Sequence, residues 1–316
     1  MLTPAFFHYF TLAGIVGLTA IGVGLGQGFA TMGSLHALHI QPQARPDIIR
    51  CLVLGLALIE TAAIIGVTIA LFLFFGLTPA HITFEGGIAE LGILSAMSLS
   101  GFTIGLVSAL PVKEACLALA RQPFFGQKIM RFMLIVLSIL QTPIIFSFII
   151  SINIKDQITQ LTTFPDSLRL LGAGLSIGLG CVGPAIGLAL FAKKACQSIG
   201  INRSAYTTLV TFSFISQAMI ETPIIFSMII GLLLVSLSSP SFARGCALLA
   251  AGLCMGIGTF STGISSGKTA GVACERIATE PHSYATISRT SLFAQGIMET
   301  ITIYALLVAL ALIFFT

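Results

Sequence analysis

The chain has 316 residues, of which 56% are hydrophobic and only 8% are charged, and its formal net charge is +4. A soluble protein carries about 25% charged residues, so this composition excludes a soluble globular protein and predicts an integral membrane protein. The seven cysteines form no Cys-x-x-Cys pair, which favours a role as small apolar side chains in the core over a metal site or a disulfide framework. The N-terminal run MLTPAFFHYFTLAGIVG has no basic region ahead of it, which favours a first membrane span over a cleaved signal peptide.

Eight apolar segments follow one another along the chain, and each reaches the ~20 residues that a helix needs to cross the hydrocarbon core. The predicted segments are 6–35, 48–76, 88–118, 128–153, 167–198, 205–237, 245–277 and 285–315. They pair as four tandem helical hairpins, so the predicted fold class is an all-α membrane protein with eight transmembrane helices. The predicted hairpin boundaries are 1–80, 81–158, 159–239 and 240–316.

The second segment holds a single acid, Glu60, near its middle. An ionisable group at mid-bilayer costs at least ~2.5 kcal/mol, so by default it indicates an ion pathway. Its surroundings recur at Gln141 in QTPIIFSFII, at Glu221 in ETPIIFSMII and at Glu299 in ETITIYALLV, with separations of 81, 80 and 78 residues. The chain is therefore one unit repeated four times, and three of the four copies keep the carboxylate.

The first helix of each hairpin is predicted to lie on the inside of the assembly. Hairpin 1 has a glycine at every second position from Gly22 to Gly28, and hairpins 3 and 4 are similarly rich in glycine. In lipid no hydrophobic force drives helices together, so small residues must allow close backbone packing. This density predicts first helices crowded into a narrow inner circle, with the bulkier acid-bearing helices outside them and facing lipid.

The orientation follows from the basic residues. Twelve of the fifteen Lys and Arg residues lie at the loops inside the hairpins, and only Lys155, Arg169 and Arg244 lie between hairpins. The positive-inside rule therefore predicts cytoplasmic hairpin loops and both termini outside.

A glycine-rich inner helix, a short polar turn and an outer helix with a mid-membrane glutamate resemble the c subunit of F-type ATP synthases. The matching stretches include GVGLGQGFA at 22–30, the turn Arg121-Gln122-Pro123, and METITIYALLVALALIFF from Met298 to Phe315. The resemblance covers nearly the whole chain as four copies in register. It implies a multi-pass protein of a bacterial-type inner membrane.

The resemblance also implies a function. The chain would be a non-catalytic rotor subunit that carries H⁺ or Na⁺ and couples ion flow to rotation, with ATP chemistry in other subunits and no further cofactor. The implied partners are other c-type chains in a ring, a stator a subunit with an essential arginine, the central stalk and membrane lipid, and no nucleic acid. Each glutamate would be neutral while it faces lipid and charged only opposite the stator.

The implied ion-binding residues are Glu60, Glu221 and Glu299, with Na⁺ as a possible metal at these sites. Family members that bind Na⁺ use a hydroxyl after the acid, an inner-helix glutamine and a backbone oxygen, and a tyrosine supports the site. The residues of this chain that match such supporting positions are Gln27, Thr61, Thr222, Thr300, Ser266, Met219 and Tyr304. Pro223 deprives the Met219 carbonyl of its helical hydrogen bond, which frees a ligand or merely kinks the helix.

Gln141, with the following Thr142, is expected to form an inactive site, because an amide cannot exchange a proton near neutral pH. The resemblance assigns the polar turns to contact with the central stalk. The turn residues are Gln41, Pro42, Arg121, Gln122, Pro123, Asn202, Arg203, Glu280 and Pro281.

The alternative is a stand-alone secondary ion-coupled transporter of eight helices. Transporters are often built from repeats, but commonly from inverted ones around a central site. Here a two-helix repeat keeps all copies in one orientation and spreads the acids over the outer helices. The sequence leaves open H⁺ against Na⁺, the number of chains in a ring, co-assembly with single-hairpin subunits, and synthesis against ATP-driven pumping.

Overall fold

A computed structural model describes residues 3–78, 82–161 and 163–316 of the chain. Within these ranges the chain is helical and contains no strand, and eight spans are long and apolar enough to cross a membrane. The predicted all-α fold class with eight transmembrane helices is therefore confirmed. The predicted boundary between hairpins 1 and 2, at residues 80 and 81, lies outside the described residues.

The helices pair into four hairpins. Their bounds are α1 (Pro4–Ile40) and α2 (Arg45–Gly76) in hairpin 1, α3 (Phe84–Val107), α4 (Ala109–Arg121), α5 (Gly126–Leu140) and α6 (Thr142–Ile158) in hairpin 2, α7 (Phe164–Ile201) and α8 (Tyr206–Ser236) in hairpin 3, and α9 (Phe242–Gly258), α10 (Phe260–Thr279) and α11 (Tyr284–Phe314) in hairpin 4. Each turn inside a hairpin is a short 3-10 helix, at Pro42–Ala44, Pro123–Phe125, Arg203–Ala205 and Pro281–Ser283.

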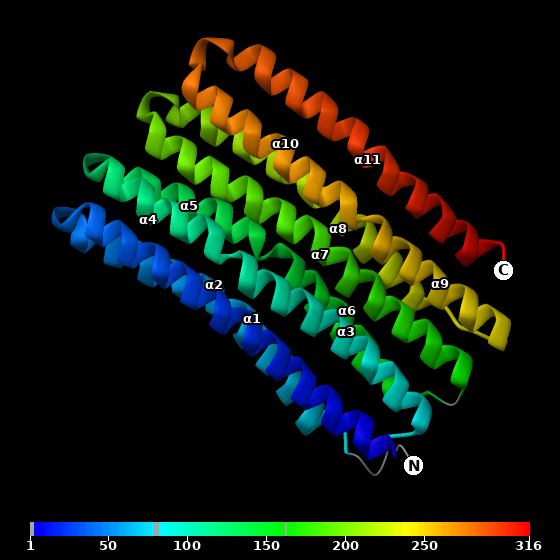
Figure 1. Ribbon diagram of the computed structural model, residues 1–316. Helices are drawn as coiled ribbons and strands as arrows, with labels where there is room; N and C mark the ends of the chain where they lie inside the picture. The colour runs from blue at the N-terminus through cyan, green and yellow to red at the C-terminus, as the bar shows by residue number, and fades with distance from the viewer. Residues whose placement is uncertain (1–2, 79–81, 162) are drawn as a thin grey trace.

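The helices run nearly parallel, with the four turns at one end and both termini at the other (Figure 1). The first helices of the hairpins form an inner layer in the order α1, α3–α4, α7 and α9–α10, and the second helices α2, α5–α6, α8 and α11 pack against it as an outer layer. The 38 residues of α7 span about 57 Å at ~1.5 Å per residue, against a hydrocarbon core of ~30 Å. The helices therefore project beyond the membrane.

Glycine allows the inner layer to pack backbone against backbone. A Cβ atom added at Gly26 would overlap the carbonyl oxygen of Gly105, and one added at Gly187 would overlap that of Gly263. Helices of the outer layer instead meet through side chains, such as the rings of Phe72 and Phe148, whose centroids lie 6.5 Å apart. The inner layer is therefore the more closely spaced of the two.

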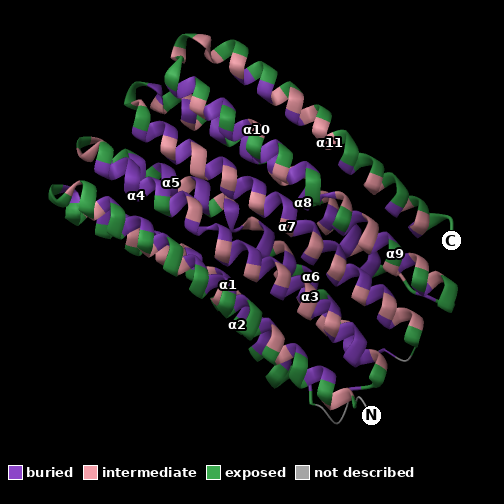
Figure 2. Cartoon of the chain, viewed as in Figure 1, coloured by how far each residue is buried: buried purple, intermediate pink, exposed green. Residues whose placement is uncertain are grey.

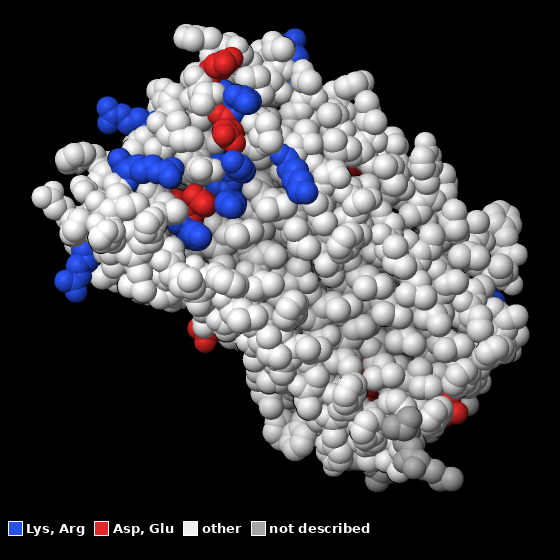
Figure 3. All heavy atoms as spheres, in the orientation of Figure 1, with Lys and Arg blue, Asp and Glu red and all other residues white. Residues whose placement is uncertain are grey.

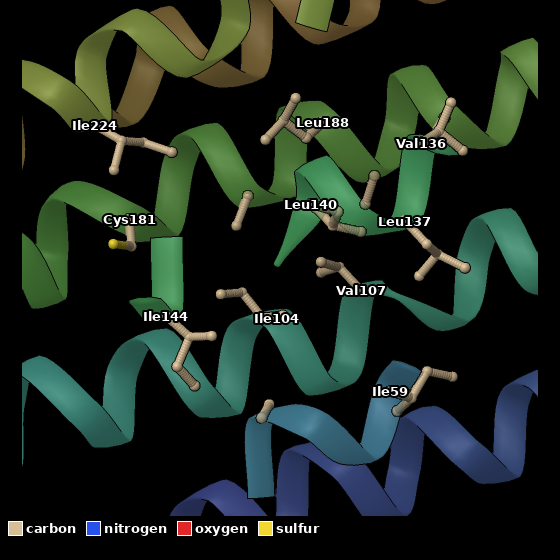
Figure 4. Close-up of a cluster of buried hydrophobic side chains, with 14 of the residues drawn as sticks. Ile59, Ile104, Val107, Val136, Leu137, Leu140, Ile144, Cys181, Leu188 and Ile224 are labelled. Atoms are coloured by element: carbon tan, nitrogen blue, oxygen red, sulfur yellow. The ribbon is translucent and has the colours of Figure 1, made fainter. Parts of the chain in front are cut away.

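The hydrophobic core lies between the two layers. Ile104 of α3 and Leu188 of α7 contribute to it from the inner layer, and Leu140, Ile144 and Ile224 contribute from the outer layer (Figure 4). All five side chains are fully buried. Figure 2 shows burial concentrated along α3 and α7, while the helices at the two ends of the layers, such as α11, remain largely exposed.

Three of the eight spans are interrupted, which the sequence did not predict. The breaks fall at Ser108 between α3 and α4, at Gln141 between α5 and α6, and at Thr259 between α9 and α10. Pro111 and Pro143 follow the first two breaks and lack the N–H that would continue the helix. The missing N–H of a proline does not break α8, however, because that helix continues through Pro223.

Gly187→Val should destabilise the inner layer by about 1–3 kcal/mol, because the added atoms would overlap the Gly263 backbone, which cannot rotate away. The measurement is thermal unfolding in detergent, followed by helical circular dichroism. Gly296→Val on α11 is the matched control, since the nearest atom to a Cβ there is the Met219 methyl at 3.9 Å. Equal melting temperatures for the two variants would contradict this account of the packing.

Candidate ion-carrying site

Glu60, Gln141, Glu221 and Glu299 recur once in each hairpin and are called the key residues. All four lie on the outer layer, but their surroundings differ. Gln141 is buried, Glu221 and Glu299 are partly buried, and Glu60 is exposed. On the inner layer, Gln27, Ser108, Leu188 and Ser266 are separated by the same numbers of residues as the four outer positions. Residues of different hairpins that are related by these separations are called equivalent.

At hairpin 2 the key residue has polar partners at both ends of its amide. Gln141 Nε2 donates to Ser108 Oγ at 3.3 Å, and Thr61 Oγ1 of the preceding hairpin lies 3.1 Å from Gln141 Oε1. The Thr61 hydroxyl is also 2.6 Å from the Leu58 carbonyl oxygen, so its single hydrogen can serve only one of these two acceptors at a time. Gln141 therefore joins hairpins 1 and 2 as a neutral, hydrogen-bonded side chain.

The same relation between neighbouring hairpins recurs at the two following acids. The Thr142 side chain lies near the Glu221 carboxyl, and the Thr222 side chain lies near the Glu299 carboxyl, while the Thr222 hydroxyl itself donates to the Ala218 carbonyl of its own helix at 3.1 Å. Each of these threonines therefore lies beside the key residue of the next hairpin in the chain. Thr142, which was expected to belong to the inactive position, lies at an acid-bearing one.

The inner layer contributes a different residue to each site. Ser108 bonds to Gln141, and Ser266 Oγ lies 3.9 Å from the sulfur of Met298, the residue before Glu299. Leu188 occupies the equivalent position in hairpin 3 and offers no ligand atom. Gln27 is partly buried on α1. The side chain that the inner layer presents at this register therefore differs from one hairpin to the next.

Two of the predicted supporting residues lie on the same helices as the carboxylates that they were expected to support. Tyr304 is 64% exposed on α11, one helical turn beyond Glu299. Met219 lies on the unbroken helix α8, two residues before Glu221.

In this series, a threonine of one hairpin pairs with the key residue of the next hairpin. At each end of the layers, one residue of the series has no such partner within the described chain. Glu60 on α2 and Thr300 on α11 are both exposed, and each lies on the hairpin at one end of the row of four. The Thr300 hydroxyl bonds only to its own helix, at 2.7 Å from the Ile297 carbonyl oxygen. One acid and one hydroxyl thus lie at opposite edges.

The predicted stalk-contact turns lie together at one end of the molecule. Gln122 Nε2 donates to the Gly200 carbonyl at 3.0 Å, and Asn202 Nδ2 donates to the Ala278 carbonyl at 2.9 Å, so each turn is tied to the next hairpin. The turns of hairpins 2 and 3 line a hollow of about 500 Å³. Phe124 at its rim is fully exposed.

Two buried pairs of ionisable side chains were not singled out as functional from the sequence. His8 Nδ1 lies 2.8 Å from Glu90 Oε1, and both side chains are almost fully buried between α1 and α3. Arg169 pairs with Asp166 at 3.2 Å and donates to the carbonyls of Leu234 and Val235. Both pairs lie toward the end of the molecule that carries the termini, so they are far from Glu60, Gln141, Glu221 and Glu299. In the sequence, these pairs could be noticed only because Glu90 and Arg169 are charged residue types within segments rich in small residues.

Comparison with known proteins gives one family. The profile of the ATP synthase C-subunit family matches residues 10–73, 171–234 and 249–312. The ATP synthase c subunit of Natranaerobius thermophilus is 44% identical to this chain over 63 residues, which are 20% of this chain and 73% of that relative. The profile matches lie in hairpins 1, 3 and 4, which are the hairpins that keep the glutamate.

Proposed function

The chain belongs to the ATP synthase C-subunit family, and from that premise we propose that it forms the ion-carrying rotor ring of an F-type ATP synthase, with Glu60, Glu221 and Glu299 as the carriers. The members of this family are non-catalytic, multi-pass membrane proteolipids, and the catalysis occurs in other subunits. The division of the chain into four c-type hairpins is part of this proposal.

One observation carries the proposal, which is the proximity of each threonine to the key residue of the next hairpin. It occurs three times within the chain, as Thr61 with Gln141, Thr142 with Glu221, and Thr222 with Glu299. The series begins with an unmatched Glu60 and ends with an unmatched Thr300. Repetition of the same arrangement between copies joins these two ends and closes a ring.

The inner layer supports the same joining of copies. Gly24 and Gly28 of α1 have open space where a Cβ would lie, whereas the equivalent Gly263 and Gly267 of α10 lie against the backbone of α7. The open surface of α1 at Gly24 and Gly28 is therefore equivalent to the surface through which α10 packs against α7. The opposite edge of α10 presents Ser261 and Ser265, which are small and exposed.

The mechanism follows from the cost of charge in lipid. A carboxyl on the outer layer must be neutral while it faces the hydrocarbon, and it can be charged only opposite the arginine of a stator a subunit or an aqueous half-channel. Moving one charge across the membrane potential is worth ~2.3 kcal/mol per 100 mV, which drives the rotation. Hairpin 2 would pass the stator without an ion, because Gln141 cannot ionise.

We propose H⁺ as the coupling ion. A Na⁺ site needs several oxygen ligands, and Leu188 replaces one of them at the site of Glu221. We also propose that the turns face the cytoplasm and contact the central stalk. The concentration of Lys and Arg at the turn end supports this orientation (Figure 3).

A secondary transporter fits the geometry less well. Transporters bring their ligand groups together near the bilayer midplane. Here the acids lie on separate outer helices, and no group of three His, Cys, Asp or Glu side chains that could hold a metal ion occurs among the described residues.

Dicyclohexylcarbodiimide should modify Glu60, Glu221 and Glu299, because each is a protonatable carboxyl on the lipid-facing layer. Peptide mapping by mass spectrometry identifies the modified residues. Modification confined to Glu85, Glu90 or Glu114 would refute the site assignment. We expect Na⁺ at neutral pH to give no protection, and protection of all three sites would identify Na⁺ as the ion instead.

Gln141→Glu should raise the ions carried per turn by about one third, because each chain would then have four carriers rather than three. The measurement is the ion-to-ATP ratio at thermodynamic balance in liposomes that contain the reconstituted complex. Gln141→Met, which adds no carboxyl, is the control and should leave the ratio unchanged. An unchanged ratio in an active, fully assembled Gln141→Glu complex would show that this position is off the ion path.

Leu35→Cys combined with Thr290→Cys should form a disulfide between copies. Within the chain, the Cys51 thiol of hairpin 1 lies near the Cys116 thiol of hairpin 2. The positions equivalent to this pair at the two open edges are Thr290 on α11 and Leu35 on α1, and both are exposed.

Mild oxidation of the double variant should give a ladder of linked chains on a denaturing gel, and each single variant should give none. The native pair serves as the internal standard. Absence of the ladder, under conditions that join Cys51 to Cys116, would contradict the head-to-tail arrangement.

A further inference from the structure

The turns of neighbouring hairpins are joined through amide side chains. Gln122 Nε2 of hairpin 2 donates to the Gly200 carbonyl of hairpin 3, and Asn202 Nδ2 of hairpin 3 donates to the Ala278 carbonyl of hairpin 4. Both bonds are partly buried, and they lie at the end of the molecule that carries the turns (Figure 1). The bond is possible because an amide has N–H groups to donate and a backbone carbonyl accepts. The amide therefore fixes each of these turns to the inner helix of the next hairpin.

The turn of hairpin 4 departs from this pattern. Its residue equivalent to Gln122 and Asn202 is Glu280, which is exposed. An ionised carboxylate accepts hydrogen bonds but has no hydrogen to donate, so Glu280 cannot repeat the bond from an amide to a carbonyl. Placed against a carbonyl alone, it would leave two acceptors facing each other without a hydrogen between them. A hairpin that follows hairpin 4 would therefore need to offer a donor at this place.

Hairpin 1 has such a donor at the equivalent position. The residues whose carbonyls accept the amide bonds, Gly200 and Ala278, are small and buried, and so is the equivalent Ala120 of hairpin 2. In hairpin 1 the equivalent residue is His39, which is exposed on α1. An imidazole has one N–H donor when neutral and two when charged. Hairpin 1 thus differs from the other hairpins at the position that complements Glu280.

Neither Glu280 nor His39 has a charged partner within the chain. Among the described residues, no ion pair involves either side chain. Glu275, which lies one helical turn before Glu280 on α10, is already paired with Lys194 of hairpin 3 at 2.8 Å. Arg276 also forms no ion pair with Glu280. The carboxylate of Glu280 is therefore available to a group outside the chain.

A second cation lies at the same edge of hairpin 1. Within the chain, the rings of Phe125 in hairpin 2 and Tyr206 in hairpin 3 have centroids 5.4 Å apart. The residues equivalent to this pair at the two open edges are Ser283 and Arg45, and Arg45 is exposed. Ser283 belongs to the turn of Glu280, whose carbonyl accepts from the Ser283 N–H at 3.0 Å. The same contact between copies would bring Arg45 close to the turn that carries the acid.

We propose that Glu280 of one copy and His39 of the next form a charged hydrogen bond that joins hairpin 4 to hairpin 1. The inference rests on the proposed ring and adds the side chains that select the partner, which is a second copy of this chain. A hydrogen bond with an ionised member is stronger than one between neutral groups. A hairpin with only a carbonyl at the position of His39 would leave the carboxylate without a donor, so the pair disfavours such a hairpin as the neighbour. The junction between copies is thus chemically unlike the junctions inside the chain.

The test measures how fast the purified ring separates into single chains in sodium dodecyl sulfate at a fixed temperature, followed by gel electrophoresis. Glu280→Lys alone would place two basic side chains together, and His39→Glu alone would place two acids together. Each should raise the dissociation rate about two- to fivefold, which is the range for an ion pair near a protein surface. The double variant exchanges the two charges and should return the rate to that of the native ring.

Glu275→Lys is the matched control, because it breaks the ion pair with Lys194 between two hairpins that are covalently joined. It should leave the dissociation rate unchanged. If the single variants fail to assemble, a ring formed by the double variant supports the pair, and failure of the double variant refutes it. Native rates in both single variants, or a double variant that dissociates as fast as they do, would overturn the inference and leave the ring itself standing. A native preparation without any ring would overturn the proposed function, and this inference with it.

Discussion

The rest of the structure depends on the close approach of the inner helices. Lipid provides no hydrophobic force between helices, so their association relies on van der Waals contact, and only residues without side chains allow backbones to meet. Gly26 against Gly105 and Gly187 against Gly263 meet in this way. The outer helices are held apart by Phe, Leu and Ile side chains. A closely spaced inner layer and a wider outer layer bend the assembly toward the inner side, which is the geometry that the proposed ring requires.

This difference in spacing also determines where charge can lie. The key residues sit on the outer layer, between neighbouring hairpins, where a threonine of one hairpin reaches the acid of the next. A carboxyl in that position is accessible from lipid yet has a polar neighbour. At hairpin 2 the amide of Gln141 fills the same position with hydrogen bonds to both sides. That hairpin therefore keeps the architecture of a site while lacking its ionisable group.

Much of the fold could be predicted from the sequence because it is repetitive. Eight apolar segments, a recurring acid and glycine-rich first helices determine the hairpins, and the structure confirms an all-helical fold with eight spans among the described residues. The contact between each threonine and the following hairpin could not be predicted, because it depends on the register between elements about 80 residues apart. Nor did proline predict the helix breaks, since Pro143 follows one whereas α8 runs through Pro223. The buried pair of His8 and Glu90 escaped notice because neither residue recurs in the repeat.

In the proposed ring, one chain contributes four consecutive hairpins. Electron cryomicroscopy of the complex extracted from membranes would show this arrangement. We expect a closed ring whose hairpins number a multiple of four, with the outer helix of every fourth hairpin interrupted at Gln141. A compact monomer or dimer of eight helices per chain, with both edges of the inner layer open to lipid, would contradict it.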